Sequence, residues 1–197
     1  MDVRSEVPGD DAEVLTVHRQ AFGDHGTVVA GLVDGLRRDD PGALSLVAVA
    51  DGAVAGHVMF SRSLLDAPRR LVDVQVLSPL AVRPAYQRRG IGTALVEAGV
   101  RLLTERGVPL VFLEGDPAYY SRLGFTAGGS HGFRKPSLRI PDAAFQVRRL
   151  PAYQPWMTGT LVYSATFWDH DCVGLRDTAA SEGTRAACPG MPDNRPA

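Results

Sequence analysis

The sequence has few of the residues that mark disulfide-rich, aromatic-rich or membrane-spanning proteins. Its two cysteines, Cys172 and Cys188, both lie near the C-terminus without metal-ligand spacing, which excludes a fold held together by several disulfides. Aromatic residues make up 7% of the chain, so we expect an aliphatic core. No segment approaches the roughly 18 consecutive apolar residues of a transmembrane helix, and the N-terminal residues contain no apolar signal region. These absences make a cytoplasmic enzyme or binding protein the default expectation.

The sequence also lacks an excess of charge of either sign. Lysine and arginine number 21 and aspartate and glutamate 22, which gives a formal net charge of −1. Nothing therefore draws the whole chain to nucleic acid or to an anionic membrane, and we expect neither as a partner. A local face of arginines would overturn that expectation for RNA. The five histidines show no His-x-x-x-His or mixed Cys/His spacing, so we expect no metal site.

The length and composition are those of one globular domain. The 197 residues are 45% hydrophobic and 22% charged, which fits a single compact core. We assign this domain to residues 1–167. Residues 168–197 carry few large apolar side chains with which to offset the entropy lost on ordering, and we expect a flexible tail there.

The N-terminal part of the chain predicts a strand, two helices and a β-hairpin. Apolar residues recur at spacings of three and four, as in amphipathic helices. Two later apolar runs flank Asp51-Gly52, a dipeptide that suits a type I′ turn. The expected elements are a strand over residues 3–7, helices over 12–22 and 28–36, and hairpin strands over 44–50 and 53–63.

The following part alternates strands and helices. A strand over residues 72–82 is interrupted at Ser78-Pro79, because proline cannot donate to a β-ladder and belongs at an edge or a bulge. An apolar stripe that stops at Gly107 predicts a helix. The remaining expected elements are that helix over 89–106, a strand over 108–113, a short helix over 117–123, an extended segment from 124, a surface loop over 128–142, and strands over 145–150 and 158–167 that are candidates to pair with each other.

The chemistry concentrates in Gln87-Arg88-Arg89-Gly90-Ile91-Gly92, where a predicted strand turns into a predicted helix. The unpaired amides and positive dipole end of a helix N-terminus favour an anion such as a diphosphate, and glycine lets a ligand approach the backbone. Close packing of the helix on the sheet would require the same glycines, so the glycines alone do not decide between these roles. A Walker loop is excluded because no lysine follows, and a dinucleotide fingerprint because a third glycine is missing.

This segment resembles the acetyl-coenzyme A signature Gln/Arg-x-x-Gly-x-Gly/Ala of the GNAT superfamily of N-acetyltransferases. Upstream, Leu80-Ala81-Val82-Arg83-Pro84 is similar to the fourth strand of that family. Downstream, Tyr120-Ser121-Arg122-Leu123-Gly124-Phe125 is similar to its Tyr-x-x-x-Gly-Phe segment. The run Gly115-Asp116-Pro117-Ala118-Tyr119-Tyr120 resembles a bacterial subgroup of small acetyltransferases whose acceptors are mostly undefined.

The resemblance implies an α/β protein of the α+β type, with a mixed, mostly antiparallel central sheet flanked by helices. Its fourth and fifth strands would splay at a bulge, and the pantetheine arm of acetyl-coenzyme A would enter the gap. Tyr120 would donate a proton to the coenzyme A sulfur. The residues implied to contact the co-substrate are Leu80, Ala81, Val82, Gln87, Arg88, Arg89, Gly90, Ile91, Gly92 and Thr93.

A general base is less well marked. We favour Glu114, acting directly or through a water molecule, because it ends the strand that borders the expected gap. Three other candidates have plainer interpretations: Asp116 suits a helix cap, Asp73 a solvated strand end and His57 a sheet-face position.

The expected reaction is direct transfer of acetyl from acetyl-coenzyme A to a primary amine of an unidentified small molecule or protein, with no covalent enzyme intermediate. The helices over 12–22 and 28–36 and the loop over 128–142 would wall the acceptor side. The alternative is a non-catalytic coenzyme A binding or sensing module of the same fold. Acetylation of aminoacyl-RNA is disfavoured by the net charge, and a homodimer is an expectation from the family alone.

Overall fold

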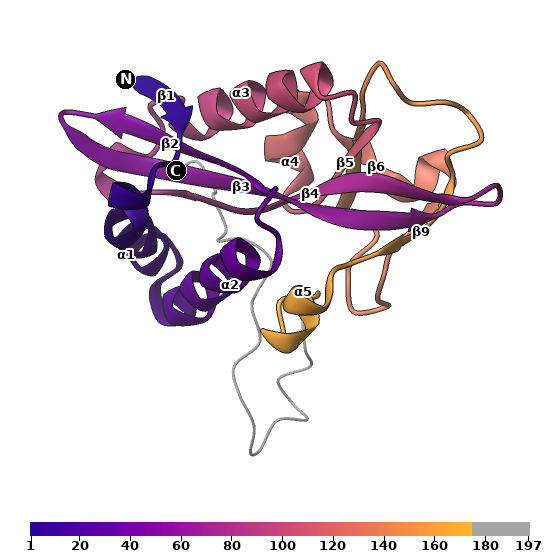
Figure 1. The fold of residues 1–197 in the computed structure, drawn as a ribbon, viewed down its shortest axis with the longest axis horizontal. Coiled ribbons are helices and arrows are strands. Elements are labelled where there is room, and N and C mark those ends of the chain that lie inside the picture. The colour runs from indigo at the N-terminus through magenta and orange to yellow at the C-terminus, as the bar shows by residue number, and fades with distance from the viewer. Residues whose placement is uncertain (175–197) are drawn as a thin grey trace.

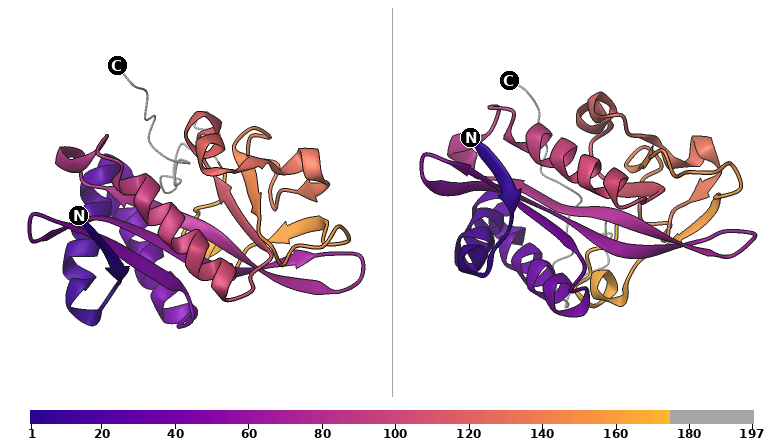
Figure 2. Two further views of the ribbon diagram at one scale, coloured as in Figure 1. Left: turned by 90° about the horizontal axis from the view of Figure 1, so that it is seen from above. Right: turned by 45° about the horizontal axis from the view of Figure 1, so that its top comes forward.

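A central sheet is covered by helices on both faces in the computed structural model, which describes residues 1–174 (Figure 1). Helix α3 (Ile91–Glu105) lies along one face. Helices α1 (Asp11–Phe22), α2 (Gly26–Asp39) and α5 (Ala165–Asp169) lie along the other (Figure 2). None of the helices in the described part of the chain is long and apolar enough to cross a membrane.

The sheet contains nine strands within the described residues. The predicted hairpin is confirmed, since Asp51 and Gly52 have left-handed φ angles of 52° and 79°, as a type I′ turn requires. The strands are β1 (Asp2–Ser5), β2 (Leu44–Ala50), β3 (Ala53–Asp66), β4 (Leu71–Val82), β5 (Leu110–Glu114), β6 (Thr126–Ala127), β7 (Phe133–Arg134), β8 (Phe145–Arg149) and β9 (Gly159–Val162), and the short helix α4 (Pro117–Tyr120) follows β5.

The strand order confirms a mixed, mostly antiparallel sheet. Neighbouring strands run β1, β2, β3, β4, β5, β8 and β6, while β9 pairs with the end of β3 and with β7. Within the described residues, β4 with β5 and β7 with β9 are the two parallel pairings. Helix α3 approaches β3 closely because Gly99 has no side chain: a Cβ there would lie 2.1 Å from a ring carbon of Phe60.

The predicted interruption of β4 is a bulge. Val58 of β3 pairs with Leu80, and Phe60 pairs with Leu77, so one β3 residue faces both Ser78 and Pro79. In the described structure β4 pairs with β5 only just before the bulge, at Gln75 with Val111 and Val76 with Phe112. From the bulge onward the two strands are separate. The expected splay of the fourth and fifth strands is thus observed.

The prediction that the last two strands pair with each other is wrong. Strand β8 pairs with β5 and β6, whereas β9 pairs with β3 and β7. Strand β3 extends three residues beyond its predicted end at residue 63 and so provides the partner. Gly159 permits the contact, since a Cβ there would lie 2.0 Å from the Asp66 carbonyl oxygen.

Packed structure also continues past the boundary that we placed at residue 167. The strand predicted over 158–167 ends at Val162, and α5 crosses that boundary. The Thr166 hydroxyl donates to Asp39 at the end of α2 (2.9 Å), and Val173 is fully buried. Residues 168–174 are therefore part of the described fold, and the rest of the predicted tail, 175–197, lies outside the described residues.

A buried polar chain joins α1 to the sheet. His18 Nε2 and His57 Nδ1 lie 2.8 Å apart, and His57 Nε2 lies 2.7 Å from the Ser45 hydroxyl. The Glu6 carboxylate accepts hydrogen bonds from Ser45 and from Arg37. Both histidines are fully buried, and burial lowers the pKa of each. The histidine pair is therefore neutral at neutral pH.

This pair makes the fold sensitive to acid. Because the folded-state pKa values lie below the unfolded value of about 6.5, the stabilisation is complete above that pH and is lost as the pH falls below it. We expect the free energy of unfolding to fall as the pH drops below this value, by at most about 1.4 kcal/mol per pH unit for each histidine. Urea denaturation at a series of pH values between 8 and 5 measures this pH dependence of the free energy of unfolding.

The variant carrying His18→Gln and His57→Gln should show a shallower pH dependence, even if its stability at pH 8 is lower. His131→Gln, at the end of the short 3-10 helix Gly128–His131, is the control and should keep the steeper dependence. Equal pH dependence in the double variant and the control would contradict this account.

Candidate active site

The loop between β4 and α3 has the conformation of an anion-binding turn. Arg88 and Gly90 have left-handed φ angles of 60° and 79°, and Gly90 immediately precedes the first turn of α3. A Cβ on Gly90 would meet nothing within 4 Å, so the backbone conformation, not crowding, requires glycine here. Arg88, Arg89 and Gly90 are exposed, so the first-turn amides and the positive end of the helix dipole face an accessible surface.

Two side chains of the predicted signature hold this loop in place. Gln87 Nε2 donates to the carbonyl oxygen of Val82 at 3.1 Å, which ties the loop to the end of β4. The Arg89 guanidinium lies over the Tyr86 ring, 5.2 Å from its centroid. In this structure Gln87 therefore fixes the shape of the loop.

The second glycine of the signature makes room for a protein side chain. A Cβ on Gly92 would lie 2.5 Å from the Tyr119 hydroxyl oxygen. That hydroxyl is hydrogen-bonded to the Thr93 side chain. Gly92 thus allows α4 to rest on the N-terminal turn of α3, which couples the loop to the element that carries Tyr120.

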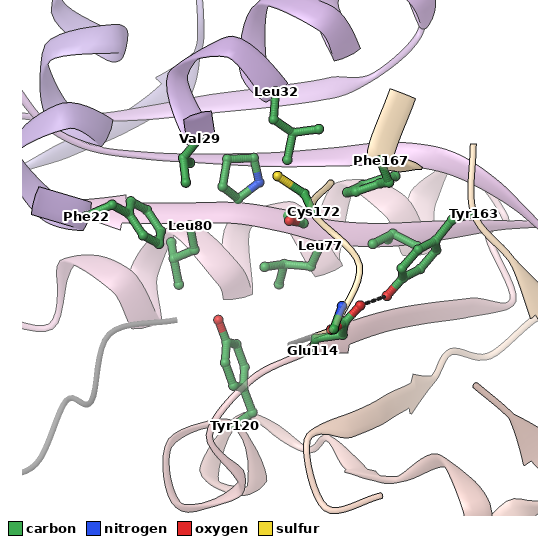
Figure 3. Close-up of a pocket in the computed structure, with 14 residues that line it drawn as sticks. Phe22, Val29, Leu32, Leu77, Leu80, Glu114, Tyr120, Tyr163, Phe167 and Cys172 are labelled. Carbon is green, nitrogen blue, oxygen red and sulfur yellow. Dashed lines mark hydrogen bonds between the residues drawn. The ribbon is translucent and has the colours of Figure 1, made fainter. Parts of the chain in front are cut away.

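A cavity of about 60 Å³ lies where β4 and β5 separate (Figure 3). Helices α1 and α2 form one wall, the β4 bulge the next, and β5, α4 and the segment 163–174 the remainder. The loop over 128–142, expected to wall the acceptor side, contributes no lining residue among those described, and 163–174 takes its place. The walls are mainly apolar and include Phe22, Val29, Leu32, Leu77, Leu80 and Phe167.

Tyr120 lines this cavity and is 1% exposed. Its hydroxyl points away from α4 toward Leu80 (Figure 3). The ring packs edge-on against Tyr119 and Phe125, with centroids 4.9 and 5.7 Å away, and a Cβ on Gly115 would lie 2.4 Å from it. Burial raises the pKa of Tyr120 well above its usual value, so the hydroxyl keeps its proton.

Glu114 lines the same cavity from the end of β5. One carboxylate oxygen accepts from the Tyr163 hydroxyl (2.8 Å) and the other from the Gly174 amide (3.0 Å). Burial raises the pKa of Glu114, while these two hydrogen bonds and the nearby Arg139 charge act in the opposite direction. A raised carboxyl pKa suits a group that takes up a proton near neutral pH.

The structure separates the predicted site residues into two groups joined by the end of β4. Leu80 lines the cavity, whereas Ala81 and Val82 continue along β4, paired with His57 and Gly56 of β3. The residues from Gln87 to Thr93 form the exposed loop and the first turn of α3 beyond them. The predicted acid and base, by contrast, share one cavity.

The plainer interpretations of the other acidic candidates agree with the structure. Asp116 caps α4 by accepting from the Ala118 amide (2.8 Å). Asp73 is exposed and pairs with Arg62. Within the described residues, no group of three or more histidine, cysteine, aspartate and glutamate side chains is placed to hold a metal ion.

Sequence reasoning missed Tyr163 and Gly174 as partners of Glu114. The sequence predicts Tyr163 inside a strand and Gly174 inside the flexible tail. No local pattern in the sequence indicates either contact, because both partners lie 49 or more residues from Glu114 in the chain.

A family model described as the acetyltransferase (GNAT) family matches residues 14–125. The chain belongs to this family. The resemblance inferred from the signature is thus confirmed, and with it an acyltransferase enzyme of GNAT fold. The segments 126–174, which supply Tyr163 and Gly174, lie outside the matched range.

Similar proteins of known sequence or structure are also named as acetyltransferases. The Escherichia coli protein named uncharacterized N-acetyltransferase YjhQ is 33% identical over 156 residues, which cover 76% of this chain and 84% of that protein. The structure of E. coli YhbS in complex with CoA is 35% identical, with a TM-score of 0.75 over 84% of this chain and 91% of that one. A Brucella melitensis GNAT acetyltransferase in complex with acetyl-CoA is 32% identical, with a TM-score of 0.67 over 84% and 97%.

The contact between Gly92 and Tyr119 gives a double-mutant cycle. With Gly92 present, Tyr119→Phe removes the hydrogen bond to Thr93 and should lower the free energy of unfolding by about 1 kcal/mol. In the Gly92→Ala background the same change removes the crowded hydroxyl and should raise the free energy of unfolding by about 1 kcal/mol. Denaturant unfolding of the four proteins measures both effects. An equal loss in both backgrounds would show that the contact is not close.

Proposed function

We propose that this enzyme transfers the acetyl group of acetyl-coenzyme A directly to a primary amine. Both relatives of known structure described above carry CoA or acetyl-CoA, which supports the same co-substrate for this chain. The proposal rests on one observation above all: the protonated Tyr120 and the carboxylate of Glu114 line the same cavity at the point where β4 and β5 part.

The loop before α3 would hold the diphosphate. Backbone amides from Arg88 to Thr93 surround a left-handed turn at the positive end of the α3 dipole, and Arg88 and Arg89 add exposed positive charge. Such a site recognises the anion through main-chain groups. The side chains of Ile91, which is buried, and of Thr93, which is hydrogen-bonded to Tyr119, instead hold the first turn of α3 in place.

The open edge of β4 would hold the pantetheine arm. Leu77–Val82 has no β5 partner within the described residues, so one edge of this stretch offers backbone groups that no neighbouring strand pairs, and the Val82 carbonyl at its end accepts from Gln87. Leu80, Ala81 and Val82 lie between the cavity and the diphosphate loop. An arm that pairs with this edge would reach from the loop into the cavity.

Tyr120 and Glu114 would handle the protons. Glu114 takes one proton from the substrate ammonium and passes it to solvent, which leaves a neutral nitrogen able to attack the thioester carbonyl carbon. As the C–N bond forms and the C–S bond breaks, Tyr120 gives its proton to the departing sulfur. The second proton lost from the nitrogen restores the Tyr120 hydroxyl, so the products are the N-acetyl amide, the free thiol and one released proton.

The alternative, a non-catalytic coenzyme A binding module, is not favoured. The relatives are named N-acetyltransferases, and the cavity is lined by both a tyrosine and a carboxylate, Tyr120 and Glu114. The acceptor's identity, a homodimer and the lack of a nucleic-acid partner stay predictions, as does a cytoplasmic location.

Removal of the Tyr120 hydroxyl tests the proposal. We expect Tyr120→Phe to lower kcat about 100-fold, because the thiolate must then leave without a positioned acid. The KM for acetyl-coenzyme A should change less than about threefold, since the ring still packs against Phe125. Thiol release with acetyl-coenzyme A and a panel of primary amines measures both constants.

Tyr153→Phe, in the loop between β8 and β9, is the matched control and should retain the wild-type kcat. Undiminished turnover by a folded Tyr120→Phe protein would remove Tyr120 as the acid. Coenzyme A binding without thiol release on any amine would instead support the non-catalytic module.

A further inference from the structure

The segment His170–Gly174 follows α5 and closes one side of the cavity. The His170 ring lies against α2, where a Cβ on Gly35 would come within 2.7 Å of its Nε2. Cys172 and Gly174 line the cavity, and the residue between them, Val173, is fully buried. This C-terminal segment is therefore docked on the helix that forms the opposite wall.

The C-terminal segment also binds the carboxylate at the centre of the site. The Gly174 amide donates to Glu114 Oε2 (3.0 Å), and the Tyr163 hydroxyl, which precedes α5, donates to Oε1 (2.8 Å). Figure 3 shows Glu114 and Tyr163 joined at the edge of the cavity. The two hydrogen bonds fix the orientation of the carboxylate toward the cavity.

Any side chain at position 174 would be strained. The φ angle of Gly174 is +61°, and a Cβ would lie 2.7 Å from the backbone carbonyl carbon of Arg139. Arg139 in turn pairs with Asp171 (Nη1 to Oδ1, 3.5 Å). A side chain at position 174 would therefore push the segment away from both Arg139 and Glu114.

The walls restrict what can bind beside Glu114. Among the described residues that line the cavity, Glu114 is the one with a formal charge at neutral pH, and the side chains from α1, α2 and α5 are apolar. An ammonium group has a counter-charge here. A carboxylate carried by the same substrate would face the like charge of Glu114 among apolar walls, and the nearby Arg139 guanidinium is already paired with Asp171, so its burial is unfavourable.

We propose that the C-terminal segment selects the acceptor: a primary amine on a small apolar group, bound as a cation by the carboxylate that Gly174 and Tyr163 orient. This inference rests on the proposed acetyl transfer and assigns Gly174 a positioning role. The segment sets the size limit, and the apolar walls exclude acceptors with an anion next to the amine.

Wild-type enzyme assayed with three amines tests the substrate class. Thiol release from acetyl-coenzyme A is measured with propylamine (small and apolar), tryptamine (large and apolar) and alanine (a carboxylate beside the amine). We expect kcat/KM for propylamine to exceed each of the others by about tenfold or more. Equal or better use of alanine or tryptamine would overturn the inference while leaving acetyl transfer intact.

Gly174→Ala tests the role of the segment. Displacement of the segment should enlarge the cavity, so the preference for propylamine over tryptamine should fall about fivefold or more while the KM for acetyl-coenzyme A is unchanged. A merely structural defect would lower kcat/KM for all amines alike and leave the preference unaltered. Gly129→Ala is the matched control, because a Cβ at Gly129 meets nothing within 4 Å.

Arg139→Gln provides a second route, since it removes the ion pair with Asp171 without a change in the main chain. It should shift the preference in the same direction by a smaller factor. An unchanged preference in folded Gly174→Ala and Arg139→Gln would overturn the inference. Absence of both thiol release and coenzyme A binding in the wild-type protein would overturn the proposed function as well.

Discussion

The separation of β4 from β5 is the feature on which the rest of the structure depends. Two residues opposite one at Ser78-Pro79 bend β4, and its pairing with β5 ends at Val76. From there to Val82 the strand has an edge that no β5 residue occupies. One end of this edge meets the N-terminus of α3, and the other meets the cavity that holds Tyr120 and Glu114. Acetyl-coenzyme A bound along this edge would place its diphosphate at the N-terminus of α3 and its acetyl group in the cavity.

Close approach at glycine positions fixes the proposed acid, Tyr120, and the proposed base, Glu114, around this gap. Gly92 lets Tyr119 rest on α3, and Gly115 leaves room for the Tyr120 ring. Gly174, likewise without a side chain, packs against the backbone of Arg139, and this contact places the Gly174 amide next to Glu114. The site therefore depends on contacts that one added methyl group would disturb, at places where no catalytic atom is involved.

The local features of the fold and site were predictable from the sequence. The hairpin at Asp51-Gly52, the bulge at Ser78-Pro79 and the turn at Gly90 each depend on residues adjacent in the chain, whose conformational preferences are strong. Long-range partners were not predictable in this way. The composition of residues 168–174 predicts no packing, because it is mostly polar. In the structure the His170 ring packs against the glycines Gly31 and Gly35 of α2, and the Gly174 amide donates a hydrogen bond to Glu114. Neither contact leaves a periodic signal in the sequence.

The central claim is that main-chain groups at the start of α3 hold the diphosphate, and a pair of glycines tests it most directly. Gly90 and Gly107 flank α3, both have left-handed φ angles (79° and 71°), and a Cβ on either meets nothing within 4 Å. Alanine therefore strains each turn similarly, by about 1 to 2 kcal/mol. Calorimetric titration with coenzyme A should give a Kd about tenfold weaker for Gly90→Ala and unchanged for Gly107→Ala. Equal affinities in the two variants, or no binding by the wild-type protein, would contradict the account.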